Sequence, residues 1–124
     1  MDADWSVGVD IAEVVRIRRA LRRWGDRFLN RHFTQGEIDY CRGRARPAES
    51  LAARFAAKEA FAKAYRGPRP LGWHDVEVVM DEGRPVFRLT GPAAEFEAKL
   101  SLSHTHAHAV AVAMVRKRRG SERA

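Results

Sequence analysis

Two carboxylates and one lysine are the side chains of this sequence whose types and spacing best suit phosphate chemistry. Glu59 and Lys63 lie four residues apart, so a helix would place them on one face, one turn from each other. Asp10 directly follows an apolar stretch, residues 5–9. If folding brings Asp10 and Glu59 together, the pair suits Mg²⁺, which takes one or two protein oxygens and completes its shell with water and substrate phosphate.

These residues also have ordinary structural explanations. A Glu–Lys pair four residues apart is a common surface feature that stabilises a helix by a few tenths of a kcal/mol. An aspartate after a strand can cap the helix that follows it. The spacing of Glu59 and Lys63 therefore leaves both a structural and a catalytic interpretation open.

Three histidines form a second candidate site. His104, His106 and His108 alternate along the chain, and in an unbroken strand they would face one side and could bind a metal such as zinc. The polar residues 101–103 and Thr105 also permit a bend that would separate the imidazoles. The pattern alone favours the bend, with at most one functional histidine.

The apolar periodicity predicts the elements that carry these residues. We expect strands at 5–9, 75–80 and 86–90, the last two forming a hairpin around 81–85. Helical spacing begins at Glu13 and continues through Phe28, with Gly25 as a possible break, and a capping box at Thr34 starts another helix. Further helices are expected at 50–65 and 91–99, followed by one or two strands over 100–115, bent near Thr105.

This order of elements predicts an α+β fold in which helices pack on a mainly antiparallel sheet. The chain has 124 residues, enough for one domain, which we place at residues 1–115. Residues 116–124 are rich in arginine and are predicted to form a disordered basic tail.

Charge and composition narrow the functional classes. The formal net charge is +7, and of the 23 basic residues only four are lysines. Arginine-rich surfaces favour acidic partners: nucleic acid, a phosphate-rich cofactor or an acidic protein. The single cysteine, Cys41, excludes an intrachain disulfide, and no apolar run approaches the length of a membrane span. We expect a cytoplasmic protein with no membrane contact.

Three ordered blocks of the sequence resemble the holo-acyl-carrier-protein synthase family of phosphopantetheinyl transferases. The blocks are GVDI at residues 8–11, RFAAKEAFAK at 54–63 and SLSHT at 101–105. Arg27-Phe28, Phe33-Thr34 and Glu37 also fit the pattern, and the resemblance extends over about residues 5–115. The sequence departs from the commoner family pattern at His106 to His108, and the basic tail matches nothing.

The resemblance implies an activity and a set of roles. It implies transfer of the 4′-phosphopantetheine arm of coenzyme A to a serine of an apo acyl carrier protein, by a homotrimer with active sites at subunit interfaces. It implies that Asp10 and Glu59 hold Mg²⁺ against the pyrophosphate and that Lys63 approaches the same phosphates. The further residues it implies are Arg54, Lys58, His104 and Thr105 for nucleotide or phosphate contacts, and Arg16, Arg23 and Arg27 for the acidic carrier protein.

The implied reaction agrees with the chemistry of these residues. The serine hydroxyl attacks the β-phosphate and releases 3′,5′-ADP, and such a transfer depends mainly on positioning and charge stabilisation. The proton acceptor stays open between Glu59, Asp10 and a water on the metal; we favour the water. The carrier proteins served, in fatty acid, polyketide or peptide synthesis, and the acceptance of acylated coenzyme A also stay open.

Two other functions remain as alternatives. A small nucleic-acid-binding module would use the arginine-rich helix and the tail, although no known reading motif is present and no nucleic acid is expected as partner. A three-histidine metalloenzyme would bind zinc at His104, His106 and His108.

Overall fold

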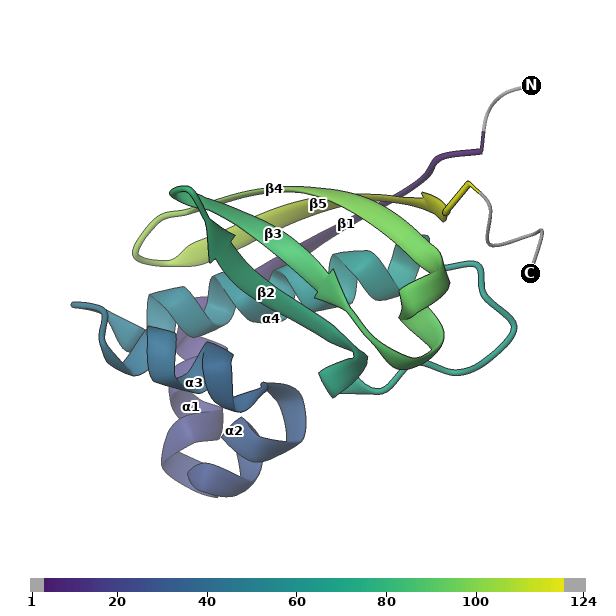
Figure 1. Cartoon of the computed structure of the whole chain (residues 1–124). Coiled ribbons are helices and arrows are strands. Elements are labelled where there is room, and N and C mark those ends of the chain that lie inside the picture. The colour runs from purple at the N-terminus through teal and green to yellow at the C-terminus, as the bar shows by residue number, and fades with distance from the viewer. Residues whose placement is uncertain (1–3, 120–124) are drawn as a thin grey trace.

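The computed structural model describes residues 4–119 and shows the predicted α+β fold (Figure 1). Four α-helices precede most of the strands along the chain. The helices are α1 (Val14–Trp24), α2 (Asp26–His32), α3 (Gln35–Arg42) and α4 (Pro47–Ala64). The strands are β1 (Ser6–Glu13), β2 (Val76–Asp81), β3 (Arg84–Leu89), β4 (Phe96–His104) and β5 (His108–Lys117). Among the described residues, no helix is long and apolar enough to cross a membrane.

All strand pairs are antiparallel, as the sequence predicts. The larger sheet has the order β1-β5-β4, and β2 and β3 form a separate two-stranded hairpin beside it. Strand β5 pairs with β1 so that Gly8 lies opposite Ala113 and Asp10 opposite Ala111. Helix α4 lies along one face of the larger sheet, and α1, α2 and α3 gather at one end of the molecule (Figure 1).

Helix α4 packs closely on β1 because small residues line the contact. A Cβ atom on Gly8 would overlap the carbonyl oxygen of Ala60 and would lie 3.0 Å from the Ala64 nitrogen. The buried positions of α4 are mostly alanines: Ala52, Ala53, Ala56, Ala57, Ala60 and Ala64. Alanine adds little width to a helix, so the backbones of α4 and β1 approach each other closely.

The helices before α4 begin and end at residues that the sequence marks. Gly25 has φ of +53°, a conformation that favours glycine, and it separates α1 from α2. Thr34 and Glu37 form the predicted capping box at the start of α3. The helical spacing from Glu13 to Phe28 therefore belongs to two helices, and Arg27 lies on the second one.

Several boundaries differ from prediction. Strand β1 continues to Glu13, so Asp10 lies inside the strand and not at its end, because β5 supplies hydrogen-bonding partners along that whole length. The helix predicted at 91–99 is only a short 3₁₀ turn, Gly91–Glu95, and β4 begins at Phe96. Pairing with β5 overrides the local helical preference there.

The basic tail also begins later than expected. Arg116 and Lys117 belong to β5, and Arg116 pairs with Glu97 of β4. The strand therefore extends two residues into the segment assigned to the tail. Residues 120–124 lie outside the described part of the chain.

The contact at Gly8 predicts a strong effect of one added methyl group. We expect Gly8→Ala to lower the free energy of unfolding by about 1–3 kcal/mol or more, since the Cβ would collide with the backbone of α4. Urea denaturation measures the change. Gly43→Ala is the matched control, because its Cβ would find only ordinary contacts of 3.6 Å or longer; equal stability of the two variants would contradict the close packing.

Candidate functional site

Asp10, Glu59 and Lys63 lie together where β1 crosses α4. The Lys63 ammonium donates to Asp10 Oδ1 at 2.9 Å and to the Val9 carbonyl at 3.0 Å. Asp10 and Glu59 line the same cavity, of about 350 Å³. The structure therefore brings together the three residues that the sequence selected from separate segments.

The carboxylate oxygens of Asp10 and Glu59 at this cavity suit a hard divalent cation. Asp10 is ion-paired with Lys63, whereas Glu59 has no hydrogen bond or ion pair with another described residue. Within residues 4–119, no group of three His, Cys, Asp or Glu side chains is placed to hold a metal ion. A cation held by Asp10 and Glu59 would take its other ligands from water or substrate, which fits Mg²⁺ and not a structural zinc site.

Arg16 is placed at the same cavity, together with Glu13 and the rings of Phe28 and Phe55. The other two arginines of the predicted carrier-protein surface lie farther along the helices. Arg23 and Arg27 place their guanidinium carbons 5.0 and 5.6 Å from the centre of the Trp24 ring, which is 46% exposed. The three arginines therefore form a basic surface that runs from the cavity to the end of α1.

Lys58 and Arg54 point into the protein interior. The Lys58 ammonium forms an ion pair of 2.7 Å with Glu37, and both side chains are almost fully buried. The other oxygen of Glu37 accepts a hydrogen bond from the Val78 nitrogen, so this pair joins α3, α4 and β2. Burial lowers the pKa of Lys58, and Glu37 opposes that shift. The expectation that Lys58 contacts a phosphate is therefore corrected, because its ammonium is ion-paired with Glu37 in the interior.

Arg54 is also buried, but its contacts are weaker. Its guanidinium carbon lies 4.3 Å from the centre of the Tyr40 ring, and Nη1 donates to the Ser50 carbonyl at 3.4 Å. The buried Nε has no hydrogen-bond partner. A buried donor without a partner is uncommon and marks Arg54 as able to take an additional acceptor.

His104 and His106 share one carboxylate, that of Glu49. Nδ1 of His106 lies 2.8 Å from Glu49 Oε2, and Nδ1 of His104 lies 3.4 Å from Oε1. The hydrogen bond from His106 lowers the pKa of Glu49. Sequence reasoning missed Glu49, because nothing in the sequence distinguishes a carboxylate that the fold will bury. Glu49 lies three residues after Arg46 and forms an ion pair with it. This spacing is only a weak sequence signal for Glu49 as a site residue.

A turn interrupts the histidine run, so the zinc interpretation is wrong. His104 ends β4, His106 lies in the turn and His108 begins β5. The Thr105 hydroxyl holds the turn by accepting hydrogen bonds from the nitrogens of Ala107 and His108. Thr105 therefore has a local structural role, and the three imidazoles do not converge.

The predicted site residues fall into two groups. Asp10, Glu59 and Lys63 form one group, and His104 belongs to the other through Glu49. Glu49 and Glu59 are ten residues apart in α4, which corresponds to about 15 Å along the helix axis. The helix therefore separates the His104 group from the carboxylate cavity within one chain.

Comparisons with known proteins agree with this fold. Residues 6–113 match the family model of the 4′-phosphopantetheinyl transferase superfamily. A holo-[acyl-carrier-protein] synthase of Chlorobaculum parvum is 43% identical over 98 residues, covering 77% of this chain and 84% of the relative.

Solved structures of the same group are also similar. The synthase of Neisseria meningitidis matches with a TM-score of 0.80 at 30% identity, over 90% of this chain and 98% of the other. The ACPS–CoA complex of Chronobacterium ammoniagenes matches with a TM-score of 0.77 at 31% identity, over 93% and 98%. The resemblance found in the sequence is confirmed: the chain belongs to the 4′-phosphopantetheinyl transferase superfamily, within the holo-[acyl-carrier-protein] synthase family.

Proposed function

We propose that this protein transfers the 4′-phosphopantetheine arm of coenzyme A to a serine of an apo acyl carrier protein and releases 3′,5′-ADP. The observation that carries the proposal is the meeting of Asp10 and Glu59 at one cavity, with Lys63 hydrogen-bonded to Asp10. The family membership supports it, as does the coenzyme A in the complex of a similar synthase. Membership also favours this function over a nucleic-acid-binding module.

Asp10 and Glu59 would hold Mg²⁺, which supplies positive charge beside the pyrophosphate of coenzyme A. Lys63 would shift part of its ammonium hydrogen bonding from Asp10 to a phosphate oxygen, and so stabilise the charge that develops during transfer. With more than half of its side chain exposed, Lys63 is accessible to an incoming substrate.

The serine hydroxyl must lose a proton as its oxygen attacks the β-phosphorus and the bond to the 3′,5′-ADP oxygen breaks. Asp10 forms an ion pair with Lys63, whereas Glu59 forms no hydrogen bond or ion pair with another described residue. Glu59 is therefore the carboxylate best placed to receive the proton, directly or through water. Arg16 borders the same cavity and would orient the acidic segment around the acceptor serine.

The transfer predicts a defined mass change. Incubation of apo acyl carrier protein with this protein, coenzyme A and Mg²⁺ should add one phosphopantetheine arm, measured by intact mass spectrometry. EDTA should abolish the gain, and Glu59→Gln should slow it by about 100-fold or more, since it removes both a ligand charge and the proton acceptor.

Glu82→Gln is the matched control, because Glu82 is exposed in the β2–β3 turn, far along the chain from the site. It should keep the full rate. The absence of any mass gain with several carrier proteins would contradict the proposed function. Full turnover by Glu59→Gln would remove Glu59 from the mechanism.

The acyl carrier protein would dock on the basic surface formed by Arg16, Arg23 and Arg27. The exposed Trp24 ring lies close to the guanidinium groups of both Arg23 and Arg27 and offers apolar contact beside their positive charge. A cavity of about 470 Å³ adjoins it, lined in part by Trp24, Arg27 and Phe28. An acidic helix carrying one apolar side chain complements such a surface.

Charge reversal on this surface should weaken carrier binding specifically. We expect Arg27→Glu to raise KM for the apo carrier at least about tenfold at low salt, with the KM for coenzyme A unchanged. Steady-state kinetics at two ionic strengths measure the effect. Arg84→Glu, at an exposed position of β3, makes the same charge change elsewhere; an equal rise in KM for that variant would contradict a localised docking surface.

The outer face of the larger sheet would form the contact between subunits of a homotrimer. The side chains that point away from α4 are apolar and exposed: Val7, Val9 and Ile11 of β1, and Val110 and Val112 of β5. Exposed apolar patches of this kind are usually covered by another protein surface. A neighbouring copy would also bring its His104 toward the carboxylate cavity, which would account for the separation of the two groups within one chain.

A charge on this face should break the assembly. We expect Val112→Asp to convert the trimer to monomers in sedimentation velocity and to abolish transfer, because an unpaired carboxylate cannot be buried between subunits. Val15→Asp is the matched control: Val15 is 41% exposed on α1, close to the 38% of Val112. A wild-type protein that sediments as a stable monomer would contradict the trimer.

A further inference from the structure

The carboxylate of Glu49 is nearly buried and faces three basic side chains. Glu49 lies in the first turn of α4 and is only 4% exposed. Its partners are His106 at 2.8 Å, His104 at 3.4 Å and Arg46 at 3.7 Å. Arg46 directly precedes α4, whereas His104 and His106 come from the end of β4 and the turn after it. One carboxylate therefore joins the start of α4 to the β4–β5 turn.

The negative charge of Glu49 decides where the protons of the two histidine rings lie. The hydrogen bond from His106 lowers the pKa of Glu49, and the N-terminus of a helix also favours a carboxylate in its first turn. An ionised carboxylate only accepts hydrogen bonds. The ring nitrogen that faces Glu49 is Nδ1 in both histidines, so both Nδ1 atoms carry a proton. Nε2 is the nitrogen that each ring keeps for another partner.

The pleat of β4 aims His104 at the helix. Leu100 and Leu102 pack against the core, and His104 shares their face of the strand because side chains alternate. Pairing with Ala109 of β5 fixes the backbone of His104 but not the rotation of its ring. The contact with Glu49 fixes the ring. Because the His104 side chain is 40% exposed, part of the imidazole stays accessible to a second copy of the chain.

The β4–β5 turn is fastened at two points that do not involve the His104 ring. The Ala107 carbonyl accepts a hydrogen bond of 2.9 Å from the Val14 nitrogen, at the start of α1. His106 is hydrogen-bonded to Glu49. A carboxylate that only fastened the turn would act through His106, which makes the shorter contact. The contact with His104 has a different consequence, because it acts on the orientation of one imidazole.

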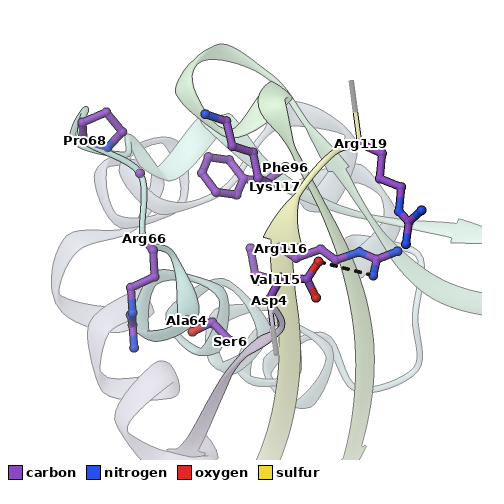
Figure 2. A pocket seen from close by; sticks show the side chains of 11 residues that line it. Asp4, Ser6, Ala64, Arg66, Pro68, Phe96, Val115, Arg116, Lys117 and Arg119 are labelled. Atoms are coloured by element: carbon purple, nitrogen blue, oxygen red, sulfur yellow. Dashed lines mark ion pairs between the residues drawn. The ribbon is translucent and has the colours of Figure 1, made fainter. Parts of the chain in front are cut away.

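The opposite end of α4 has basic side chains without a shared acceptor. Arg66, Lys117 and Arg119 surround a hollow there, and their charged groups point apart (Figure 2). The ion pair in that view joins Arg116 to Asp4, and neither residue belongs to α4 (Figure 2). The convergence of basic groups on one carboxylate therefore distinguishes the N-terminal end of α4 from its C-terminal end.

We propose that Glu49 is a positioning residue for His104. Its carboxylate holds the proton of His104 on Nδ1 and so directs Nε2 toward the phosphates of a coenzyme A bound by a neighbouring copy. As an imidazolium, His104 donates from Nδ1 to Glu49 and from Nε2 to a phosphate oxygen at the same time. This inference rests on the proposed function and adds to it a residue that touches no substrate and acts only through His104.

Spectra of the ring nitrogens test the contact without any substrate. Long-range ¹H–¹⁵N NMR at an alkaline pH, at which histidine is ordinarily neutral, should show the proton of His104 on Nδ1 in the wild type. In Glu49→Ala the proton should move to Nε2, the form that free histidine favours. Asp39→Ala removes an exposed carboxylate of α3 and should leave the His104 signals unchanged. Unchanged amide signals away from the turn show that each variant is folded.

Kinetics in two backgrounds separate positioning from a structural role. Glu49→Ala should lower kcat for the transfer about tenfold, with the KM for the carrier protein unchanged. In protein that already carries His104→Ala, it should change kcat by less than about twofold, because the residue through which Glu49 acts is gone. His106→Ala removes the shorter contact with Glu49 but leaves His104 in place, so kcat should stay within about twofold of the wild-type value.

Either of two results would overturn the proposal. One is a His104 proton on Nε2 in the wild type, or a proton that stays on Nδ1 in Glu49→Ala. The other is a Glu49→Ala variant that keeps full kcat, or that loses kcat equally with and without His104. A wild-type protein that transfers nothing would refute the proposed function instead, and the ring spectra would still decide whether Glu49 holds His104.

Discussion

Helix α4 approaches β1 so closely that Gly8 has no room for a side chain beside the Ala60 carbonyl. This contact fixes the height of α4 above the sheet and its position along β1. Asp10 lies two residues beyond Gly8 on the same face of the strand, and Glu59 and Lys63 flank Ala60 on the helix. The distance of 2.9 Å between Lys63 and Asp10 therefore follows from backbone packing, and does not depend on a flexible loop.

A buried polar network holds the other side of α4. Glu37 accepts from Lys58 and from the Val78 nitrogen, so one carboxylate joins α3 and β2 to the helix that carries the candidate site. Burying an ion pair has a large desolvation cost, which these hydrogen bonds offset, and removing either partner would leave a buried charge without compensation. The network gives α4 one defined rotation, with Lys58 inward and Glu59 toward the cavity.

The sequence predicted which helices and strands form better than where they begin and end. It also predicted the residues at the carboxylate cavity better than those farther from it. Asp10, Glu59 and Lys63 lie in a strand and a helix whose periodicity is visible in the local sequence. The family resemblance then predicted that the three residues act at one site. Lys58 was misassigned because local sequence does not show that Glu37, 21 residues earlier, would meet it in the core. Phe96 looked helical because its strand depends on hydrogen bonds from β5. Glu49 was missed because its two histidine partners lie more than 50 residues away.

We propose that Asp10 and Glu59 together hold the cation beside the pyrophosphate, with His104 supplied by a second copy of the chain. A crystal structure with coenzyme A and Mg²⁺ tests this most directly. We expect a trimer in which Asp10 and Glu59 hold the cation beside the pyrophosphate, with Lys63 of the same subunit and His104 of its neighbour near the phosphates. Coenzyme A bound within one subunit, or phosphates placed away from both carboxylates, would contradict it.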